Sequence, residues 1–410
     1  MVRRANIRSL NWTAAFILAV SLLGSATFGV QANAEPIKFG APIPITGPFA
    51  SDGFVMEKGL KLAIAEINAQ GGLLGRQIEM IVFDIGDLTP DKLQAAALNL
   101  VEKEQVNVLI NGYGGMGPDI PAFCPYDVPY LHVDGPAYVV ELWTQMGCNN
   151  IYMFIDTAAN YGGITFHRLM EMGHEFSSKK LAIIEGPYDW EFEMTGGATE
   201  AAEALGWEVV LKEQVDFGIS EWGPILTKLH DAGPALIYSE FLDPAAVNAL
   251  VDQFNTDPVK GALLYVGYTG AVPAFNEVVS RGIADGVLAM TPSAQMPDDQ
   301  GREFVAKWQE AYGEDPPIGI AAEIYDEVMF WATAVETVGS VDDYDAINET
   351  LGTQSYDGIT GILKLNDQHF VNSTDEAAPV QILQIQNSEV VTIMIGSKVV
   401  RDFVKPAWHD

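Results

Sequence analysis

The chain has 410 residues, of which 48% are apolar and 19% charged. A chain of this length and composition can form two or three domains with large cores, and it is not typical of a disordered protein. The formal net charge of −33 argues against nucleic acid and anionic membranes as partners, because no basic patch opposes this field. The surplus of acids is explained by solubility in a salty habitat, and it also mildly favours cationic solutes.

Residues 1–34 have the pattern of a signal peptide. Three arginines precede an apolar stretch over residues 13–24, and Ala32 and Ala34 give the small-residue pattern that signal peptidase accepts. No cysteine follows that could carry a lipid, and the apolar stretch is short for a membrane anchor. We predict cleavage after Ala34, a periplasmic location and no membrane insertion of the mature chain. Cleavage would change the formal net charge from −33 to −36, because three arginines are lost.

Strand and helix patterns alternate from residue 37 onward. Apolar strand patterns cover residues 37–45, 76–84, 106–111 and 128–133. Apolar residues at helical spacing between residues 60 and 67 predict a helix that Gly71 and Gly72 end. Thr89 and Pro90 have the residue types that begin the next helix.

A second series of alternating units follows. Strand patterns cover residues 151–155, 179–185, 207–215 and 235–241, with helices predicted from about 160, 191 and 219 and one capped by Asp243. After residue 286 the sequence predicts a strand at 287–292, two longer helices across 299–340 and a strand-rich tail over 360–402.

Two series of this kind predict an α/β protein with two Rossmann-like lobes, each with a parallel sheet and helices on both faces. The tail is expected to return to the second lobe, which makes both lobes discontinuous. We predict lobe 1 from residues 35–154 plus 287–355, and lobe 2 from residues 155–286 plus 356–410.

Residues 42–84 resemble the N-terminal signature of periplasmic solute-binding proteins for branched-chain amino acids and amides. The matching residues are Thr46-Gly47-Pro48, Gly53, Ile67-Asn68, Gly71-Gly72, Gly75 and Asp84. The order of units and the helical segment at 302–336 extend the similarity over nearly the whole mature chain. The resemblance implies two lobes joined by a three-stranded hinge, which close on a small-molecule solute and dock on the transmembrane permease subunits of an ABC importer.

Ligand contacts are expected in the loops beyond the strand ends, which meet at the cleft. In the loop at 46–53, Asp52 lies where the family often presents a ligand contact, and a plain connecting turn is the alternative. In the loop at 111–119, family members that bind amino acids place a Ser or Thr hydroxyl. This chain has Tyr113, Gly114 and Gly115 there, whose backbone N–H groups can still approach an oxygen closely.

The loop after residue 133 carries Asp134, Gly135, Pro136 and Ala137, where the family commonly has a small residue and Thr. A carboxylate at Asp134 would repel a ligand carboxylate and attract an ammonium or another hydrogen-bond donor. A helix N-cap or turn role for Asp134 is the alternative.

In the second lobe the expected contacts are mostly aromatic. Trp190 falls where relatives place a Tyr that stacks on the solute, and amino-acid binders often carry a Glu near the position of Tyr268 and Thr269. Aromatic walls stack on flat ligands or surround a cation, whereas core packing is the alternative for each ring. The other candidates in this lobe are Tyr161, Glu240 and Phe241.

The chain therefore lacks part of the residue set with which the family binds the carboxylate and the ammonium of an amino acid. This favours an amide, an aromatic compound or a cationic amine as the solute over leucine or valine. A sensory protein that presents its solute to a receptor is the alternative function.

No motif of a hydrolase, a metal site or a nucleotide cofactor is found, so we expect neither catalysis nor a cofactor. Cys124 and Cys148 form an expected disulfide, and a reactive nucleophile is the weaker alternative.

Overall fold

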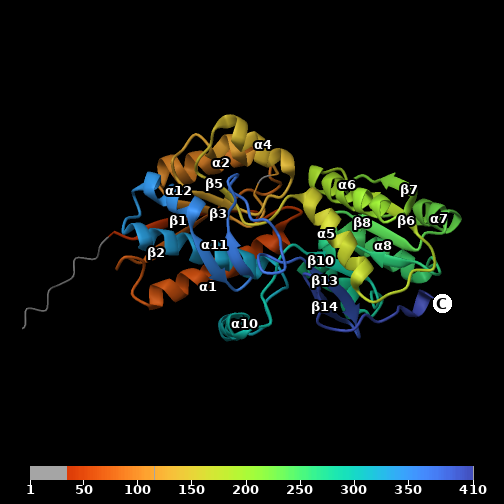
Figure 1. Cartoon of the computed structure of the whole chain (residues 1–410). Coiled ribbons are helices and arrows are strands. Elements are labelled where there is room, and N and C mark those ends of the chain that lie inside the picture. Colours follow the sequence, from red (N-terminus) through yellow and green to blue (C-terminus); the bar gives the residue numbers. More distant parts are fainter. Residues whose placement is uncertain (1–34, 115, 410) are drawn as a thin grey trace, which may run out of the picture. The chain divides into compact units, whose positions relative to one another are not determined.

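Two sheets organise residues 35–114 and 116–409, the part of the chain that this computed structural model describes (Figure 1). The predicted signal peptide at residues 1–34 and the candidate ligand residue Gly115 lie outside these described residues.

The first sheet has five parallel strands in the order β2-β1-β3-β4-β5. Nearly every side chain of β1 and β3 is buried, as expected for strands covered on both faces. The bounds are β1 Ile37–Ile43, β2 Ile78–Asp84, β3 Val108–Asn111, β4 Tyr130–His132 and β5 Ile151–Met153.

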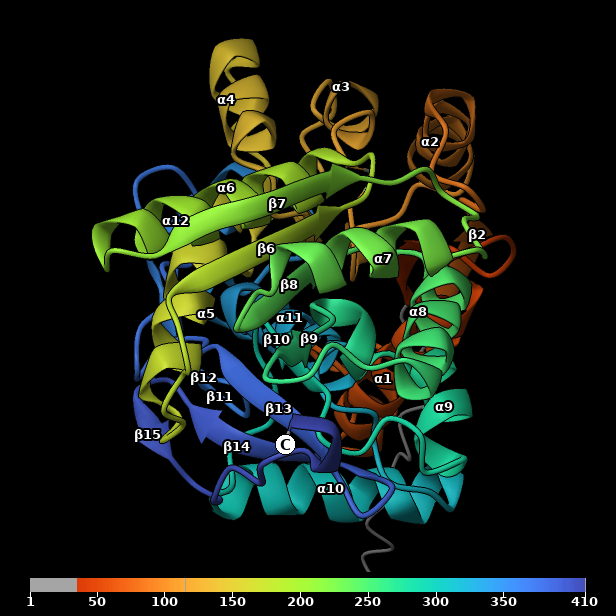
Figure 2. The same cartoon turned by 90° about the vertical axis from the view of Figure 1, so that its right-hand side faces the viewer.

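Helices cover both faces of this sheet because its connections run in opposite directions from β1. Helix α1 packs against α11 on one face, and α2, α3 and α4 form a row on the other (Figure 2). Thr89 is the N-cap of α2 and Pro90 its first residue, as predicted. The bounds are α1 Ala50–Ala69, α2 Pro90–Ala97 continued by a π-helical turn at Leu98–Lys103, α3 Asp119–Phe123, α4 Ala137–Met146, α10 Asp299–Tyr312, α11 Ile320–Val338 and α12 Tyr344–Thr353.

The second sheet has eight strands in the order β15-β14-β13-β10-β9-β8-β6-β7. Strands β6 to β10 are parallel, and β13, β14 and β15 add an antiparallel edge. Residues 381–399 of the predicted tail thus pair with the second sheet, whereas residues 361–364 belong to a separate two-stranded sheet. The bounds are β6 Lys180–Glu185, β7 Glu208–Gln214, β8 Leu236–Glu240, β9 Leu263–Tyr265, β10 Leu288–Thr291, β13 Gln381–Gln386, β14 Glu389–Ile395 and β15 Lys398–Val399.

Helices α5 and α6 pack against each other, whereas α7 and α8 lie on the side of this sheet that faces the viewer in Figure 2. The side chain of Asp243 caps α8, as predicted, by accepting from the N–H groups of Ala245 and Ala246. The bounds are α5 Ala158–Glu171, α6 Asp189–Ala204, α7 Gly223–Ala232, α8 Pro244–Thr256 and α9 Asn276–Ser280, with 3-10 turns at Tyr268–Ala271, Pro273–Phe275 and Ala407–His409.

Three passages of the chain connect the two sheets, which agrees with the three-stranded hinge that the resemblance implied. The first follows β5 and the third leads to β13, and they run side by side, because Met153 and Phe370 form a parallel bridge. The second follows β10, where the N–H of Met296 donates to the carbonyl of Ile359 at 2.7 Å. The third passage begins after a hairpin of β11 (Ser355–Gly358) and β12 (Gly361–Lys364).

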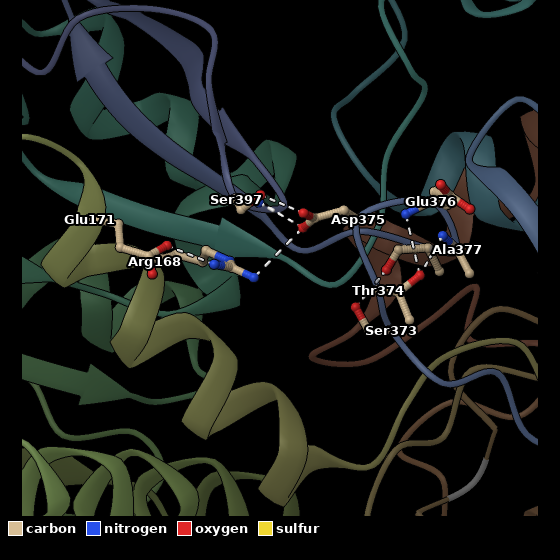
Figure 3. Close-up of polar contacts among 9 residues, drawn as sticks. Arg168, Glu171, Ser373, Thr374, Asp375, Glu376, Ala377 and Ser397 are labelled. Carbon is tan, nitrogen blue, oxygen red and sulfur yellow. Dashed lines mark hydrogen bonds and ion pairs between the residues drawn. The ribbon is translucent and has the colours of Figure 1, made fainter.

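Polar contacts fix the third passage to the second lobe (Figure 3). Arg168 on α5 forms ion pairs with Glu171 at 2.6 Å and with Asp375 at 3.6 Å. Asp375 also accepts from the N–H of Ser397 at 2.8 Å, at the turn between β14 and β15. Helix α5, the third passage and the antiparallel edge of the second sheet are thus held together.

The lobe boundaries predicted from the sequence stay a proposal. The prediction placed residues 287–355 in the first lobe, but β10 pairs with β9 and β13 in the second sheet. A short apolar strand shows burial in its sequence but not its partner, so its sheet could not be read from the pattern.

Cys124 and Cys148 form the predicted disulfide, with their Cα atoms 5.4 Å apart. Both cysteines of the chain are used in this bond, so a reactive thiol at either position is excluded. No helix within residues 35–114 and 116–409 combines the length and the apolar character needed to cross a membrane.

Candidate functional site

A cavity lies where the carboxyl ends of the parallel strands of both sheets meet. Its volume is about 60 Å³, several times the roughly 10–15 Å³ that one water requires, so it has room for a small solute. The strand ends of open parallel sheets are where ligands bind in such folds. Eight of the predicted ligand residues line it: Asp52, Tyr113, Asp134, Gly135, Pro136, Trp190, Tyr268 and Thr269.

Asp52 lies in the first turn of α1 and is only 2% exposed. A Cβ atom on the next residue, Gly53, would overlap the carbonyl oxygen of Pro44, so glycine lets the helix begin this close to β1. Burial raises the pKa of Asp52 to about 7, although hydrogen bonds from Tyr268 and Ser51 favour the ionised form. Asp52 therefore changes its charge near neutral pH.

Two tyrosines hold the carboxylate of Asp52. The hydroxyl of Tyr113, after β3, donates to Oδ2, and the hydroxyl of Tyr268, after β9, donates to the same atom at 3.3 Å. The rings of Tyr113 and Tyr268 meet edge to face at 6.5 Å between centroids, and Phe49 packs on Tyr113 at 5.8 Å. The bond from Tyr268 to Asp52 crosses from one sheet to the other.

Glu323, in the first turn of α11, is a further lining residue that the sequence analysis did not single out. It is 6% exposed, and its Oε1 has no hydrogen-bond partner among the described residues. Burial raises the pKa of Glu323 to about 8, with a hydrogen bond from the backbone of Ser293 acting in the opposite direction and the charges of Asp326 and Asp52 adding to the increase. Three acids near the start of the predicted helix, Glu323, Asp326 and Glu327, were the available signal, but only the fold brings Glu323 to Asp52.

Asp134 is the third buried acid of the cavity, at 3% exposure. Its Oδ2 accepts from the N–H of Gly117 at 3.0 Å, so it joins the loops after β3 and β4. The N-cap alternative for Asp134 is wrong, because Pro136 is the N-cap residue of α4 and makes no side-chain cap. Burial and the neighbouring Asp119 raise the pKa of Asp134 well above its ordinary value.

Trp190 closes the cavity from the second lobe. It lies in the first turn of α6 and is 8% exposed, and its Nε1 has no partner among the described residues. A Cβ atom on Gly135 would overlap Cζ3 of Trp190, so this glycine allows the indole to pack against the loop after β4. Trp190 is therefore both a cavity wall and a packed contact between the lobes.

Glu191 fixes the start of α6, and thereby the position of Trp190. Its Oε2 accepts from the N–H of Tyr188 at 2.6 Å, and its Oε1 accepts from the N–H of Leu242 at 2.7 Å, in the loop after β8. Burial raises the pKa of Glu191 to about 7. The segment that carries Trp190 is thus a capped helix start, close to the start predicted at about residue 191.

A second hydrogen bond joins the lobes beside the cavity. The N–H of Ala137, at the start of α4, donates to Oε2 of Glu193 on α6 at 2.7 Å. A carboxylate at a helix N-terminus is favourable, because the unpaired N–H groups there carry partial positive charge. Ala137 thus takes part in contact between the lobes through its backbone.

Other predicted ligand residues do not line the cavity. Gly114 packs against Asp134, and Tyr161 is fully buried, with its hydroxyl accepting from the N–H of Asp156 at 3.0 Å. Glu240 is fully buried and accepts from the hydroxyl of Tyr265 at 2.7 Å, whereas Phe241 packs on Phe217 and Trp222. Core packing explains these positions.

The charge of the cavity has one sign. Asp52, Asp134 and Glu323 line it, and none of the described lining residues is Lys, Arg or His. The remaining wall is largely apolar, with Phe49, Met116, Ile155, Leu242, Val272 and Ile320 among its members. No group of side chains suited to hold a metal ion occurs among residues 35–114 and 116–409.

Comparison with known proteins places these features in a family. Residues 36–389 match the family model described as periplasmic binding protein. A leucine-, isoleucine-, valine-, threonine- and alanine-binding protein of Pseudomonas aeruginosa is 22% identical over 87% of this chain and 92% of its own. A Leu/Ile/Val-binding protein homolog 1 of Brucella suis is 26% identical over 82% of this chain and 90% of its own.

A solved structure from Silicibacter pomeroyi, described as a branched-chain amino acid ABC transporter, superposes with a TM-score of 0.80. It is 26% identical and covers 91% of this chain and all of its own. Because the family model spans most of the chain and the two-sheet fold agrees with it, the chain belongs to the periplasmic binding protein family.

Proposed function

We propose that this protein is the extracytoplasmic solute-binding component of an ABC importer and that it captures one small solute in the cavity between the two sheets. The observation that carries this proposal is a cavity lined from both sheets, with Asp52 and Tyr268 bonded across it. The relatives named above are described as binding proteins for amino acids or as ABC transporters, and they extend over nearly the same length.

The proposed mechanism is closure of two lobes over the solute. A solute shifts such an equilibrium only by binding the closed form better, which requires contacts with both lobes at once. Asp52 and Glu323 would bind it from one side, beside Asp134, and Trp190, Tyr268 and Thr269 from the other. The closed protein would then dock on the permease, and no bond of the solute would change.

The sensory alternative gains no support from the relatives, whose descriptions name binding and transport. Export is part of the proposal, with the first 34 residues removed on the way. N-terminal sequencing of the protein from the cell envelope should then begin at Glu35.

The experiment that tests binding starts from protein that has been unfolded and refolded to remove any co-purified solute. Calorimetry with amino acids, amides, aromatic compounds and amines should give saturable 1:1 binding for at least one class. The bound compound should be recovered chemically unchanged by mass spectrometry. Conversion of the compound to a product, or no binding by any class, would overturn the proposed function.

A further inference from the structure

Three buried carboxyl groups without a cationic partner line the cavity. A buried charge is costly unless an opposite charge pairs with it. A solute with its own carboxylate would add a fourth acidic group to a site in which none of the described lining residues is Lys, Arg or His. A solute with a positive charge would supply the partner that the walls lack.

Glu323 provides a second and independent observation. It lines the cavity and is 94% buried, yet its Oε1 accepts no hydrogen bond from any described residue. Buried polar atoms in native proteins are nearly always paired, and each exception needs an explanation such as a missing ligand. An unpaired carboxylate oxygen requires a donor, which an N–H group of the solute can provide.

The aromatic rings around Asp52 fit the same ligand. Phe49, Tyr113 and Tyr268 form a chain of edge-to-face contacts beside its carboxylate, and the ring of Trp190 also lines the cavity. Aromatic faces attract cations through the ring quadrupole and also cover the apolar part of an amine.

We propose that the solute is an organic ammonium that bears N–H donors and no carboxylate, with its nitrogen held by Asp52 and Glu323. This inference rests on the proposed function and specifies its solute class. Asp134 already accepts from the backbone of Gly117, so its role is to keep the loops in place.

Protons should leave the site when such a cation binds. The pKa values of about 7 for Asp52 and about 8 for Glu323 mean that both groups carry protons for much of the time near neutral pH. A cation favours the ionised forms, so affinity should rise as the pH increases from 6 to 8. A carboxylate ligand would show the opposite trend.

Other titratable groups surround this pair and must be considered in the pH profile. Burial and the charge of Glu323 raise the pKa of Glu327, and Asp326 lies on the same helix. The groups that face Asp52 and Glu323 from neighbouring elements are Tyr113, Asp134, Tyr161 and Tyr268. Tyr161 and Tyr268 stay neutral at pH 6 to 8, since burial raises the pKa of each well above the ordinary value.

The test uses solutes that differ by one group. Leucine, isoamylamine and 4-methylpentanoate share one carbon skeleton and carry both charges, only the ammonium, and only the carboxylate. Benzylamine and benzoate form an aromatic pair. Calorimetry on refolded protein at pH 6, 7 and 8, in buffers of different ionisation enthalpy, gives the affinity and the number of protons released.

We expect at least one of the two amines to bind at least about tenfold more tightly than the matched acid and than leucine, and its affinity to rise by about tenfold or more from pH 6 to 8 with proton release. Glu323→Gln should reduce amine affinity by about tenfold and flatten the pH profile. Glu327→Gln is the matched control, because Glu327 is also buried one helical turn away but does not line the cavity. It should leave the affinity unchanged.

The wild-type comparison remains decisive even if a variant fails to fold. Tighter binding of leucine, 4-methylpentanoate or benzoate, or affinity that falls as the pH rises, would overturn the cation inference and leave the binding function intact. Binding by neither amine would also overturn it. The proposed function itself fails only if the broader panel of solutes gives no binding either.

Discussion

The two walls of the cavity differ in what they offer a solute. The wall from the first sheet and α11 carries all three carboxyl groups, Asp52, Asp134 and Glu323. The wall from the second sheet carries no described charged side chain and contributes Trp190, Leu242, Pro244, Tyr268, Thr269, Val272 and Pro292. Under the proposed function, the first wall would select a solute by its charge while the protein is open, and the second wall would add an apolar surface and two hydroxyls when the protein closes.

The largest loss of solute affinity should come from Trp190→Ala, which removes the main ring of the second wall. We expect the dissociation constant to rise by about 30- to 100-fold, corresponding to roughly 2–3 kcal/mol. The unliganded protein should stay folded, because the indole N–H has no partner to lose and the ring borders a cavity. Calorimetry and circular dichroism measure the two properties.

Trp222→Ala is the matched control in the same lobe. Trp222 is fully buried outside the cavity, and its Nε1 donates to the carbonyl of Ala246 at 2.9 Å. This variant should lose about 3–5 kcal/mol of stability. If Trp190→Ala instead unfolds the protein as Trp222→Ala does, then Trp190 is a core residue and not a ligand wall.

A smaller effect is expected when the walls are held apart. In Gly135→Ala the new methyl group would overlap Trp190, so the closed form should be destabilised and affinity reduced by about tenfold, near 1–2 kcal/mol. Gly196→Ala on α6 is the control, because its new Cβ would meet no atom within 4 Å. Small-angle scattering with solute should show a more open Gly135→Ala protein. An unchanged scattering profile would mean that close packing of Trp190 on Gly135 is not required for the lobes to close.

The acids of the first wall should also affect stability without any ligand. Burial raises the pKa of Asp52 to about 7 and of Glu323 to about 8. At pH values above the ordinary pKa of a carboxyl group, the folded protein therefore holds protons that the unfolded chain has released. Stability should therefore fall as the pH rises from 5 to 8. Thermal unfolding should show a decrease of roughly 2–4 °C that is smaller in Glu323→Gln. A midpoint that rises with pH over this range would contradict the assignment.

The smallest effect separates the two hydroxyl groups on Asp52. Tyr268→Phe removes a bond between the walls, whereas Tyr113→Phe removes a bond within the first wall. Each bond contributes about 1 kcal/mol. Because only the first acts on closure, Tyr268→Phe should weaken binding about fivefold, and Tyr113→Phe should mainly lower stability. Equal losses of affinity would mean that both hydroxyls contact the solute.

The sequence predicted most of the fold because its strands are continuous apolar runs and its helices carry clear caps such as Thr89 and Asp243. It also placed Asp52, Trp190 and Tyr268 at strand ends that meet in the cavity. It missed Glu323, because the approach of α11 to α1 depends on packing between segments far apart in the chain. The same reason explains why β10 was assigned to the first lobe, since strand partners depend on tertiary contacts.

The disulfide links the predicted export to the loop that carries Asp134 and Gly135, because such a bond forms in an oxidising compartment. Cys124 follows α3 and Cys148 precedes β5, and the 24-residue separation between them spans β4 and the turn that presents Asp134 and Gly135. A disulfide that closes a loop of this length stabilises the folded state by about 3 kcal/mol, because it lowers the conformational entropy of the unfolded chain. Protein made in a reducing cytosol would lack this disulfide and should have a less ordered loop at Asp134 and Gly135, so its measured affinities would understate those of the oxidised protein.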